Sequence, residues 1–160
     1  MFSIRDVRSR PIACGGRVLP EFAREGDAKY INSPETPLFN KSRELYALDL
    51  ARKAMSDQDT VLVMEGYTDV IMAHQHGISN AVAVLGTALN AQHVPVLRRF
   101  TDSITLVLDG DAAGQRRTMD ILDQLLALFV NHEIELRILG LPEGSDPCDV
   151  ISSHGREAFA

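Results

Sequence analysis

The sequence predicts an α/β fold, in which a parallel sheet flanked by helices is preceded by part of a smaller mixed α/β lobe. Two runs, 60–64 and 103–108, are largely apolar, as inner strands buried on both faces are. From residue 60 onwards, strand-like and helix-like segments alternate, which is typical of βαβ units. Earlier, short apolar runs are separated by polar, proline-rich turns. We therefore expect two units, residues 1–57 and 58–160.

The first unit begins with strand-like segments. They cover residues 2–7, a run from Pro11 onwards, and residues 29–31. The pair Gly15-Gly16 permits a bend, or a close approach of the backbone to another group. Two prolines within 32–37 exclude regular structure there and predict a fixed loop. A helix is expected over 42–55. Its apolar residues recur at helical spacing along one face: Leu45, Leu48, Ala51 and Met55.

The second unit alternates strands and helices. The expected strands are 60–64, 81–84, 103–108 and 134–139. The expected helices are about 68–76, 91–99, 112–129 and 147–153. Right-handed crossovers bring the carboxyl ends of parallel strands to a common edge. Because ligands bind beyond that edge in open α/β sheets, we expect the functional site there.

Charge is unevenly distributed along the chain, whose formal net charge is −6. Residues 1–57 carry ten Lys or Arg and eight Asp or Glu, a net of +2, and residues 58–160 carry six and fourteen, a net of −8. The acidic total argues against tight sequence-independent binding of nucleic acid, but the first unit supplies cations. The alternative is an ordinary acidic domain with solvated charges.

Composition narrows the setting. No apolar stretch approaches the ~18 residues of a membrane span and no secretory signal is visible, so we expect a cytoplasmic location without a membrane partner. The two cysteines, Cys14 and Cys148, do not form a Cys-x-x-Cys pair, so no zinc is expected. We expect both to be small buried side chains. The five histidines show no ligand spacing and are expected at the surface or an interface.

Carboxylates follow two of the predicted inner strands. Glu65 comes directly after 60–64, and Asp109 and Asp111 come after 103–108. Three negative charges at one sheet edge repel one another unless a cation holds them, and such oxygen-rich clusters suit Mg²⁺. The pattern therefore predicts a metal-dependent phosphoryl-transfer site.

Three further acids are candidate ligands: Asp69, Asp146 and Asp149. Two of them, Asp69 and Asp146, also have a purely structural interpretation. Asp69 falls in the first turn of a predicted helix, where acids are favoured, and Asp146 precedes a proline as a helix N-cap does. An Asp-Gly-Asp run such as 109–111 is, taken alone, a common turn.

Two motifs at these positions resemble the signatures of the Toprim domain. They are Glu65-Gly66-Tyr67-Thr68-Asp69 and Asp109-Gly110-Asp111-Ala112-Ala113-Gly114. The upstream runs 14–17, 29–36 (Lys-Tyr-Ile-Asn-Ser-Pro-Glu-Thr) and 39–41, with 141–147 downstream, are similar to bacterial DnaG-type DNA primases. The similarity spans essentially the whole chain.

This resemblance implies a central piece of the primase RNA-polymerase core: the later part of its N-terminal lobe, over 1–57, and its Toprim domain, over 58–160. It implies a DNA-dependent RNA polymerase that makes short RNA primers for DNA replication by two-metal nucleotidyl transfer with Mg²⁺ or Mn²⁺. The implied partners are a single-stranded DNA template, ribonucleoside triphosphates and the RNA primer. The replicative helicase would bind only through domains that this chain lacks.

The resemblance also assigns roles to residues. The catalytic metal ligands carry over onto Glu65, Asp109 and Asp111, with Asp146 as a further acidic position. The substrate-facing residues carry over onto Arg17, Lys29 and Lys41, with Asn32 nearby. One departure is Cys148, which stands where the family often has an aspartate. Either Asp149, which follows directly, substitutes for that aspartate, or that ligand is dispensable.

Two alternatives remain: another Toprim enzyme, for which further features would be expected, and a protein that is not an enzyme. A topoisomerase would need a transesterifying tyrosine in a separate domain, a RecR-like protein would need a four-cysteine zinc module, and a nuclease would lack the block at 29–41. Outside the enzymes, the alternative is a nucleic-acid or nucleotide-binding module without turnover, in which metals serve only for docking.

Overall fold

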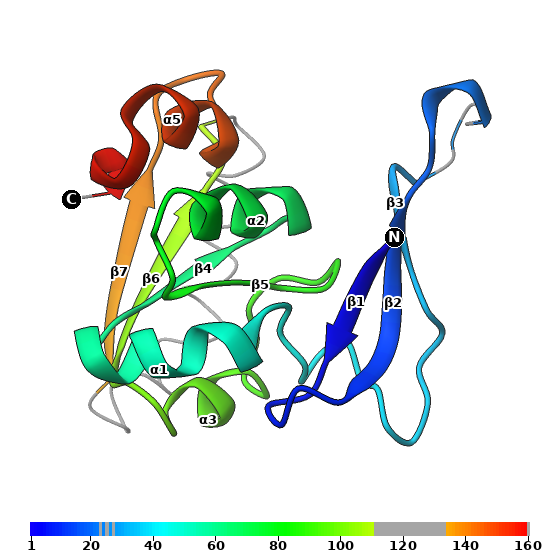
Figure 1. The fold of residues 1–160 in the computed structure, drawn as a ribbon, viewed down its shortest axis with the longest axis horizontal. Coiled ribbons are helices and arrows are strands. Elements are labelled where there is room, and N and C mark those ends of the chain that lie inside the picture. Colours follow the sequence, from blue (N-terminus) through cyan, green and yellow to red (C-terminus); the bar gives the residue numbers. More distant parts are fainter. Residues whose placement is uncertain (23, 25, 27, 111–133, 160) are drawn as a thin grey trace.

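The computed structural model describes residues 1–22, 24, 26, 28–110 and 134–159. These residues form a larger and a smaller sheet (Figure 1). The larger sheet has four parallel strands in the order β5-β4-β6-β7. They are β4 (Val61–Met64), β5 (Ala81–Ala83), β6 (Ser103–Leu108) and β7 (Glu135–Gly140). The predicted fold, a parallel sheet flanked by helices and preceded by a smaller lobe, is confirmed.

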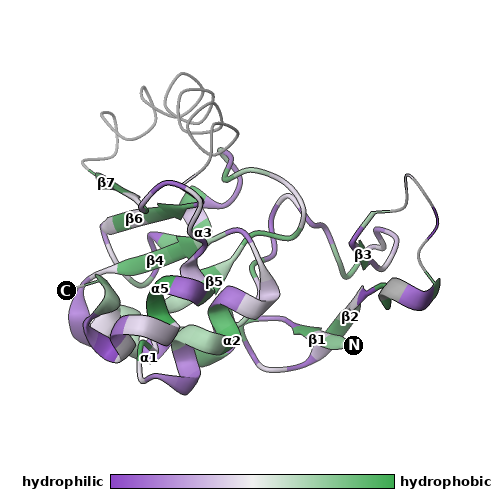
Figure 2. Ribbon diagram, turned by 90° about the horizontal axis from the view of Figure 1, so that it is seen from above, coloured by the Kyte–Doolittle hydropathy of each residue, from purple (hydrophilic) through white to green (hydrophobic). Residues whose placement is uncertain are grey.

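Helices cover both faces of the parallel sheet. On one face lie α1 (Leu48–Gln58) and α3 (Val94–Leu97); on the other lie α2 (Tyr67–Gln75) and α5 (Pro147–His154), followed by η2 (Gly155–Phe159). Successive strand residues alternate between the two faces. In β4, Val61 and Val63 pack with α1, whereas Leu62 and Met64 pack with α2. In Figure 2 the strands β4, β5 and β6 are mostly green, in keeping with their burial on both faces.

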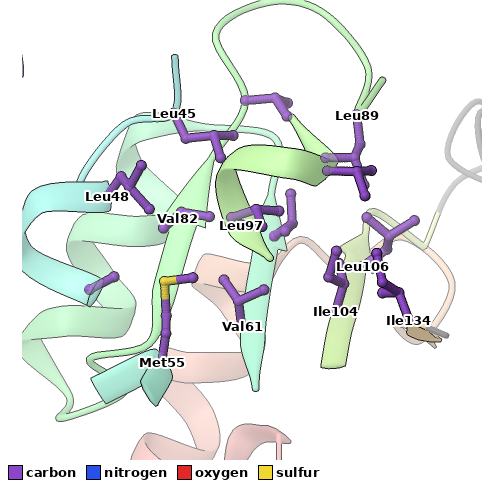
Figure 3. Close-up of a cluster of buried hydrophobic side chains, with 14 of the residues drawn as sticks. Leu45, Leu48, Met55, Val61, Val82, Leu89, Leu97, Ile104, Leu106 and Ile134 are labelled. Carbon is purple, nitrogen blue, oxygen red and sulfur yellow. The ribbon is translucent and has the colours of Figure 1, made fainter. Parts of the chain in front are cut away.

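The larger core cluster fills the space between the sheet and α1 and α3 (Figure 3). The apolar face predicted for the first helix is confirmed, because Leu45, Leu48, Ala51 and Met55 are all buried. Fully burying a Leu or Met side chain stabilises the folded state by about 1.5–3 kcal/mol. These contacts therefore fix α1 on the sheet.

The helix α1 begins at Leu48, so the predicted start at residue 42 is wrong. Ala47 has a left-handed backbone (φ 62°), and Tyr46 pairs with Ala83 instead of continuing a helix. The Tyr46 amide donates to the Ala83 carbonyl oxygen at 2.8 Å, and the Ala83 amide donates back at 3.2 Å. Leu45 is nevertheless fully buried, so the apolar spacing runs across residues that are not helical.

The helix predicted over 91–99 is shorter, because α3 covers only Val94–Leu97. Before it, the Asn90 side chain accepts a hydrogen bond from the Gln92 amide at 2.9 Å and forms a turn. The helix predicted over 112–129 lies outside the described residues. The other predicted strands and helices of this unit agree with the structure to within about two residues, the usual uncertainty of element ends.

The smaller sheet is antiparallel, in the order β1-β2-β3. Its strands are β1 (Phe2–Arg5), β2 (Pro11–Arg17) and β3 (Tyr30–Asn32), and the short helix η1 (Pro20–Phe22) follows β2. No bend occurs at Gly15-Gly16, since β2 continues through both glycines. The alternative, a close approach of the backbone, is confirmed at Gly15, where an added Cβ atom would lie 2.9 Å from Tyr67 Cε2. Gly15 pairs with Phe2 on one side and Asn32 on the other.

A third buried cluster joins the two sheets. It contains Ile4 from β1, Tyr67 from α2 and Leu85, with Phe39 from the proline-containing loop. Because α1 begins at Leu48, well before the predicted boundary, yet packs on the parallel sheet, the two units share core contacts, and the boundary at 57/58 stays a prediction. Within the described residues, no helix combines the length and the apolar character needed to cross a membrane.

Two side chains lie where the sequence did not predict them. His93 is fully buried rather than at the surface, because it precedes α3 and its Nδ1 accepts a hydrogen bond from the Asn90 amide at 3.2 Å. Cys14 is exposed rather than buried, although the flanking Ala13 and Gly15 are partly or fully buried.

Candidate metal and nucleotide site

Glu65 and Asp109 lie at the same edge of the parallel sheet. Glu65 directly follows β4 and Asp109 directly follows β6, and these neighbouring strands are parallel, with Val63 paired to Leu106. Both carboxylates are partly buried. Asp111 lies outside the described residues. The arrangement places one carboxylate on each of two adjacent strand ends.

A cavity of about 280 Å³ opens beside Glu65. Its lining is mainly apolar and includes Leu106 and Leu108 from β6, together with Thr87 from the segment after β5. Leu108 directly precedes Asp109. Glu65 therefore supplies a charged group to a largely apolar wall, next to the strand end that carries the second carboxylate.

The turn after Glu65 is closely packed at a glycine. Gly66 is the N-cap residue of α2, and a Cβ atom at this position would lie 2.6 Å from Asp69 Oδ2. Without that Cβ, Asp69 folds back over the turn and is only 9% exposed. The Glu65-to-Asp69 motif thus brings a second carboxylate against the turn that holds the first.

Asp69 also meets residues from the far end of the sequence. Single ligand atoms of Asp69, Asp146 and Cys148 lie within 4.8 Å of one another, and the Cys148 thiol donates to Asp69 Oδ1 at 3.1 Å. Asp146 and Cys148 reach this position because α5 packs on α2. We call these three residues the Asp-Asp-Cys cluster.

Burial dominates the protonation of this cluster. It raises the pKa of Asp69, as does the nearby charge of Asp146, while the Cys148 hydrogen bond and the positive charge of Lys29 act in the opposite direction. The pKa of Cys148 rises to about 12, first through burial and then through its hydrogen bond to Asp69. Cys148 is therefore a protonated thiol at neutral pH, and it serves as a hydrogen-bond donor to Asp69.

Asp146 and Asp149 also cap helix α5. The Asp146 side chain accepts from the Asp149 amide at 2.8 Å, and the Asp149 side chain accepts from the Asp146 amide at 3.5 Å, which together form a capping box. The interpretation of Asp146 as an N-cap is therefore confirmed. Asp149 is exposed and does not belong to the Asp-Asp-Cys cluster.

Backbone hydrogen bonds of Gly110 connect the strand end that carries Asp109 to the loop that leads to Asp146. The Gly110 amide donates to the Ser145 carbonyl oxygen at 3.1 Å, and the Gly144 amide donates to the Gly110 carbonyl oxygen at 3.4 Å. Gly110 directly follows Asp109, and Ser145 directly precedes Asp146. The loop after β7 thus ties Asp146 to the strand end that carries Asp109.

The predicted substrate-binding cations lie on the smaller sheet and its loop. Arg17 and Lys29 are exposed and approach the Tyr30 ring, with their charged groups 5.8 and 6.0 Å from its centroid. The charge of Lys29 also acts on Asp69. Lys41 is exposed. Of the three predicted cations, Lys29 thus acts on the charge of Asp69.

Asn32, the fourth predicted substrate residue, is engaged within the protein. Its Nδ2 donates to the Leu85 carbonyl oxygen at 3.0 Å, and its Oδ1 accepts from the Tyr67 hydroxyl. Sequence reasoning did not predict this link, nor the contact between Cys148 and Asp69. The sequence offered one signal for the role of Cys148, namely its position in the first turn of the helix after β7.

Comparisons with known proteins show which families the chain resembles. Residues 59–139 match the Toprim domain family, and residues 1–52 match the N-terminal domain of the DNA primase catalytic core. The DNA primase of Pseudomonas aeruginosa is 46% identical over 159 residues, which cover 99% of this chain and 23% of that protein. For the Escherichia coli K12 DNA primase, the identity is 42%, with 99% and 26% covered. The chain thus spans 23–26% of the length of these relatives.

Solved structures give the same result. A DNA primase domain from Pseudomonas aeruginosa has a TM-score of 0.89 at 46% identity, with 99% of this chain and 48% of that chain covered. The Escherichia coli primase catalytic core has a TM-score of 0.86 at 41% identity, with 99% and 49% covered. A DnaG primase catalytic domain bound to single-stranded DNA has a TM-score of 0.84 at 41% identity, with 99% and 49% covered. The chain therefore belongs to the Toprim family and is homologous to part of the catalytic core of bacterial DNA primases.

Proposed function

We propose that this chain forms the metal-binding part of a DNA primase, a DNA-dependent RNA polymerase that synthesises short RNA primers on a single-stranded DNA template. One observation carries the proposal: in a chain of the Toprim family, Glu65 and Asp109 follow adjacent parallel strands at one sheet edge. That edge is where open α/β sheets bind their ligands.

Divalent cations fit the donor set at this edge. Glu65, Asp109 and Asp111 are the proposed catalytic ligands, and Asp69 and Asp146 add carboxylate oxygens nearby, which suits a hard cation such as Mg²⁺ or Mn²⁺ rather than zinc. The exposed, helix-capping position of Asp149 favours a role in holding the start of α5, next to Asp146, rather than direct binding of the cation. When bound, two such cations would activate an attacking hydroxyl and neutralise the negative charge on a leaving group.

The proposed reaction joins two nucleotides. A 3′-hydroxyl attacks the α-phosphorus of a ribonucleoside triphosphate, a new P–O bond forms, and the bond to the β-phosphate oxygen breaks with release of pyrophosphate. Protein groups contribute mainly position and charge to such transfers. Lys29 and Arg17, held beside the Tyr30 ring, are proposed to bind phosphates of the triphosphate or the template. Lys41 is proposed to extend this basic surface.

The remaining partners follow from the family. Ribonucleoside triphosphates and the RNA primer would share the acidic edge, and the solved primase domain bound to single-stranded DNA supports a DNA template. A replicative helicase is proposed to bind outside this chain, and a cytoplasmic location suits a bacterial replication protein.

The test is template-directed incorporation of ribonucleotides with Mg²⁺ or Mn²⁺. We expect Glu65→Gln, which removes the charge but keeps the shape, to abolish incorporation. Glu157→Gln, at an exposed residue of η2, is the matched control and should behave as the unmodified chain does. Incorporation unchanged by Glu65→Gln would contradict metal catalysis at this site. DNA binding without incorporation would instead favour a binding module.

A further inference from the structure

We infer that Asn32 is a positioning residue for the metal site and not a substrate contact. Its carboxamide holds both the turn that carries Glu65 and the segment that lines the cavity beside it. The inference rests on the proposed function of Glu65 as a metal ligand. It differs from the role implied by resemblance, in which Asn32 lies among the substrate-facing residues.

Both halves of the Asn32 carboxamide are used within the protein. Oδ1 accepts a hydrogen bond from the Tyr67 hydroxyl, and Nδ2 donates to the Leu85 carbonyl oxygen at 3.0 Å. Asn32 ends β3 of the smaller sheet, whereas Tyr67 and Leu85 belong to the unit built on the parallel sheet. One side chain therefore connects the smaller sheet to two separate segments of the larger unit.

Tyr67 transmits this connection to Glu65. It is the first residue of α2 and lies two positions after Glu65. Its ring stacks on Phe2 at 4.7 Å and meets Tyr46 edge-on at 4.7 Å. On a further side the backbone of Gly15 is so close that an added Cβ would lie 2.9 Å from Tyr67 Cε2. The ring is thus held on several sides, and its hydroxyl is fixed by Asn32.

The Tyr67 hydroxyl is a buried donor, because the residue is only 5% exposed. A buried donor that loses its acceptor costs free energy. Removing the Asn32 carboxamide therefore loosens the turn from Gly66 to Tyr67 rather than leaving it unchanged.

Leu85 places the second contact of Asn32 at the cavity. Leu85 directly precedes Gly86, which lines the cavity with Thr87 and Glu65. The carboxamide thus spans from the turn after β4 to the segment after β5. Since these two segments flank Glu65, Asn32 sets the spacing around the carboxylate without contacting a ligand itself.

The experiment measures Mn²⁺ binding by electron paramagnetic resonance, with no nucleotide present. The compared variants are Glu65→Gln, Asn32→Ala, Tyr67→Phe, the double variant Asn32→Ala/Tyr67→Phe, and Tyr46→Phe. Tyr46→Phe is the matched control, because Tyr46 packs on the same ring and its hydroxyl makes no hydrogen bond among the described residues. Tyr67→Phe keeps the packed ring, so it tests the link even if Asn32→Ala fails to fold.

We expect Asn32→Ala and Tyr67→Phe each to weaken the Glu65-dependent Mn²⁺ binding about three- to tenfold, the effect of one lost hydrogen bond. The double variant should bind no more weakly than the worse single variant, because both remove the same link, and Tyr46→Phe should leave binding unchanged. The inference about Asn32 would be overturned if Tyr67→Phe left Mn²⁺ binding unaltered, or if the effects of the two single variants multiplied in the double variant. Neither result would contradict the proposed role of Glu65. Mn²⁺ binding that Glu65→Gln leaves intact would instead refute the proposed role of Glu65.

Discussion

Replacing Gly110 by alanine tests the close packing between the strand end that carries Asp109 and the loop that leads from β7 to Asp146. An added Cβ would overlap the Pro142 carbonyl oxygen and would lie 2.8 Å from the Leu141 carbonyl oxygen. These are backbone atoms, so no side-chain rotation relieves the overlap. The loop after β7 must move away, and the hydrogen bonds that join Gly110 to Ser145 and Gly144 are then weakened or lost.

The size of the effect follows from these contacts. Overpacking costs about 1–3 kcal/mol, and each hydrogen bond contributes about 0.5–1.5 kcal/mol. Because moving the loop relieves the overlap while breaking the bonds, the two costs add only in part. We expect Gly110→Ala to lower the free energy of unfolding by about 2–4 kcal/mol, a large fraction of the stability of a typical domain.

Urea unfolding monitored by circular dichroism measures this loss. Gly140→Ala is the matched control, since Gly140 also lies at the acidic edge, at the end of β7, and a Cβ there would meet nothing within 4 Å. Its free energy of unfolding should change by no more than about 0.5 kcal/mol. Equal stability of Gly110→Ala and Gly140→Ala would refute the close packing at Gly110.

Three other outcomes are expected. Asp149→Ala should lower the free energy of unfolding by about 1 kcal/mol without changing Mn²⁺ affinity in calorimetry, whereas Asp146→Ala should reduce both. Iodoacetamide should alkylate Cys14 before Cys148 in time-resolved mass spectrometry, since Cys14 is exposed and the pKa of Cys148 is raised to about 12. Burial lowers the pKa of His93 below 6.5, so its contribution to stability is complete above about pH 6.5 and is lost as the pH falls below it. In denaturant titrations at decreasing pH, the free energy of unfolding should fall less steeply for His93→Gln than for the unmodified chain.

The parallel sheet could be predicted because its inner strands are apolar on both faces. Four residues from Val61 to Met64 are buried without exception, and no alternating pattern competes with that assignment. The same pattern placed Glu65 and Asp109 at strand ends. Helix starts were harder to predict. Leu45 keeps the apolar spacing of α1, although Ala47 breaks the helix with a left-handed backbone.

Side-chain partners distant in sequence could not be predicted. The contact between Cys148 and Asp69 depends on how α5 packs on α2, and residues 79 positions apart carry no local signal of such packing. The same is true of Asn32, whose carboxamide meets residues 35 and 53 positions away. Resemblance placed Asn32 near the site, but only the coordinates show which groups its carboxamide contacts.

The most direct test of the account is a crystal of this chain soaked in Mn²⁺, with the ion located by its anomalous scattering. The account predicts a peak at the carboxyl ends of β4 and β6, with oxygen atoms of Glu65 and Asp109 within about 2.5 Å of bound ions that share the site. Peaks confined to other carboxylates, with these two side chains directed to opposite faces of the sheet, would contradict it.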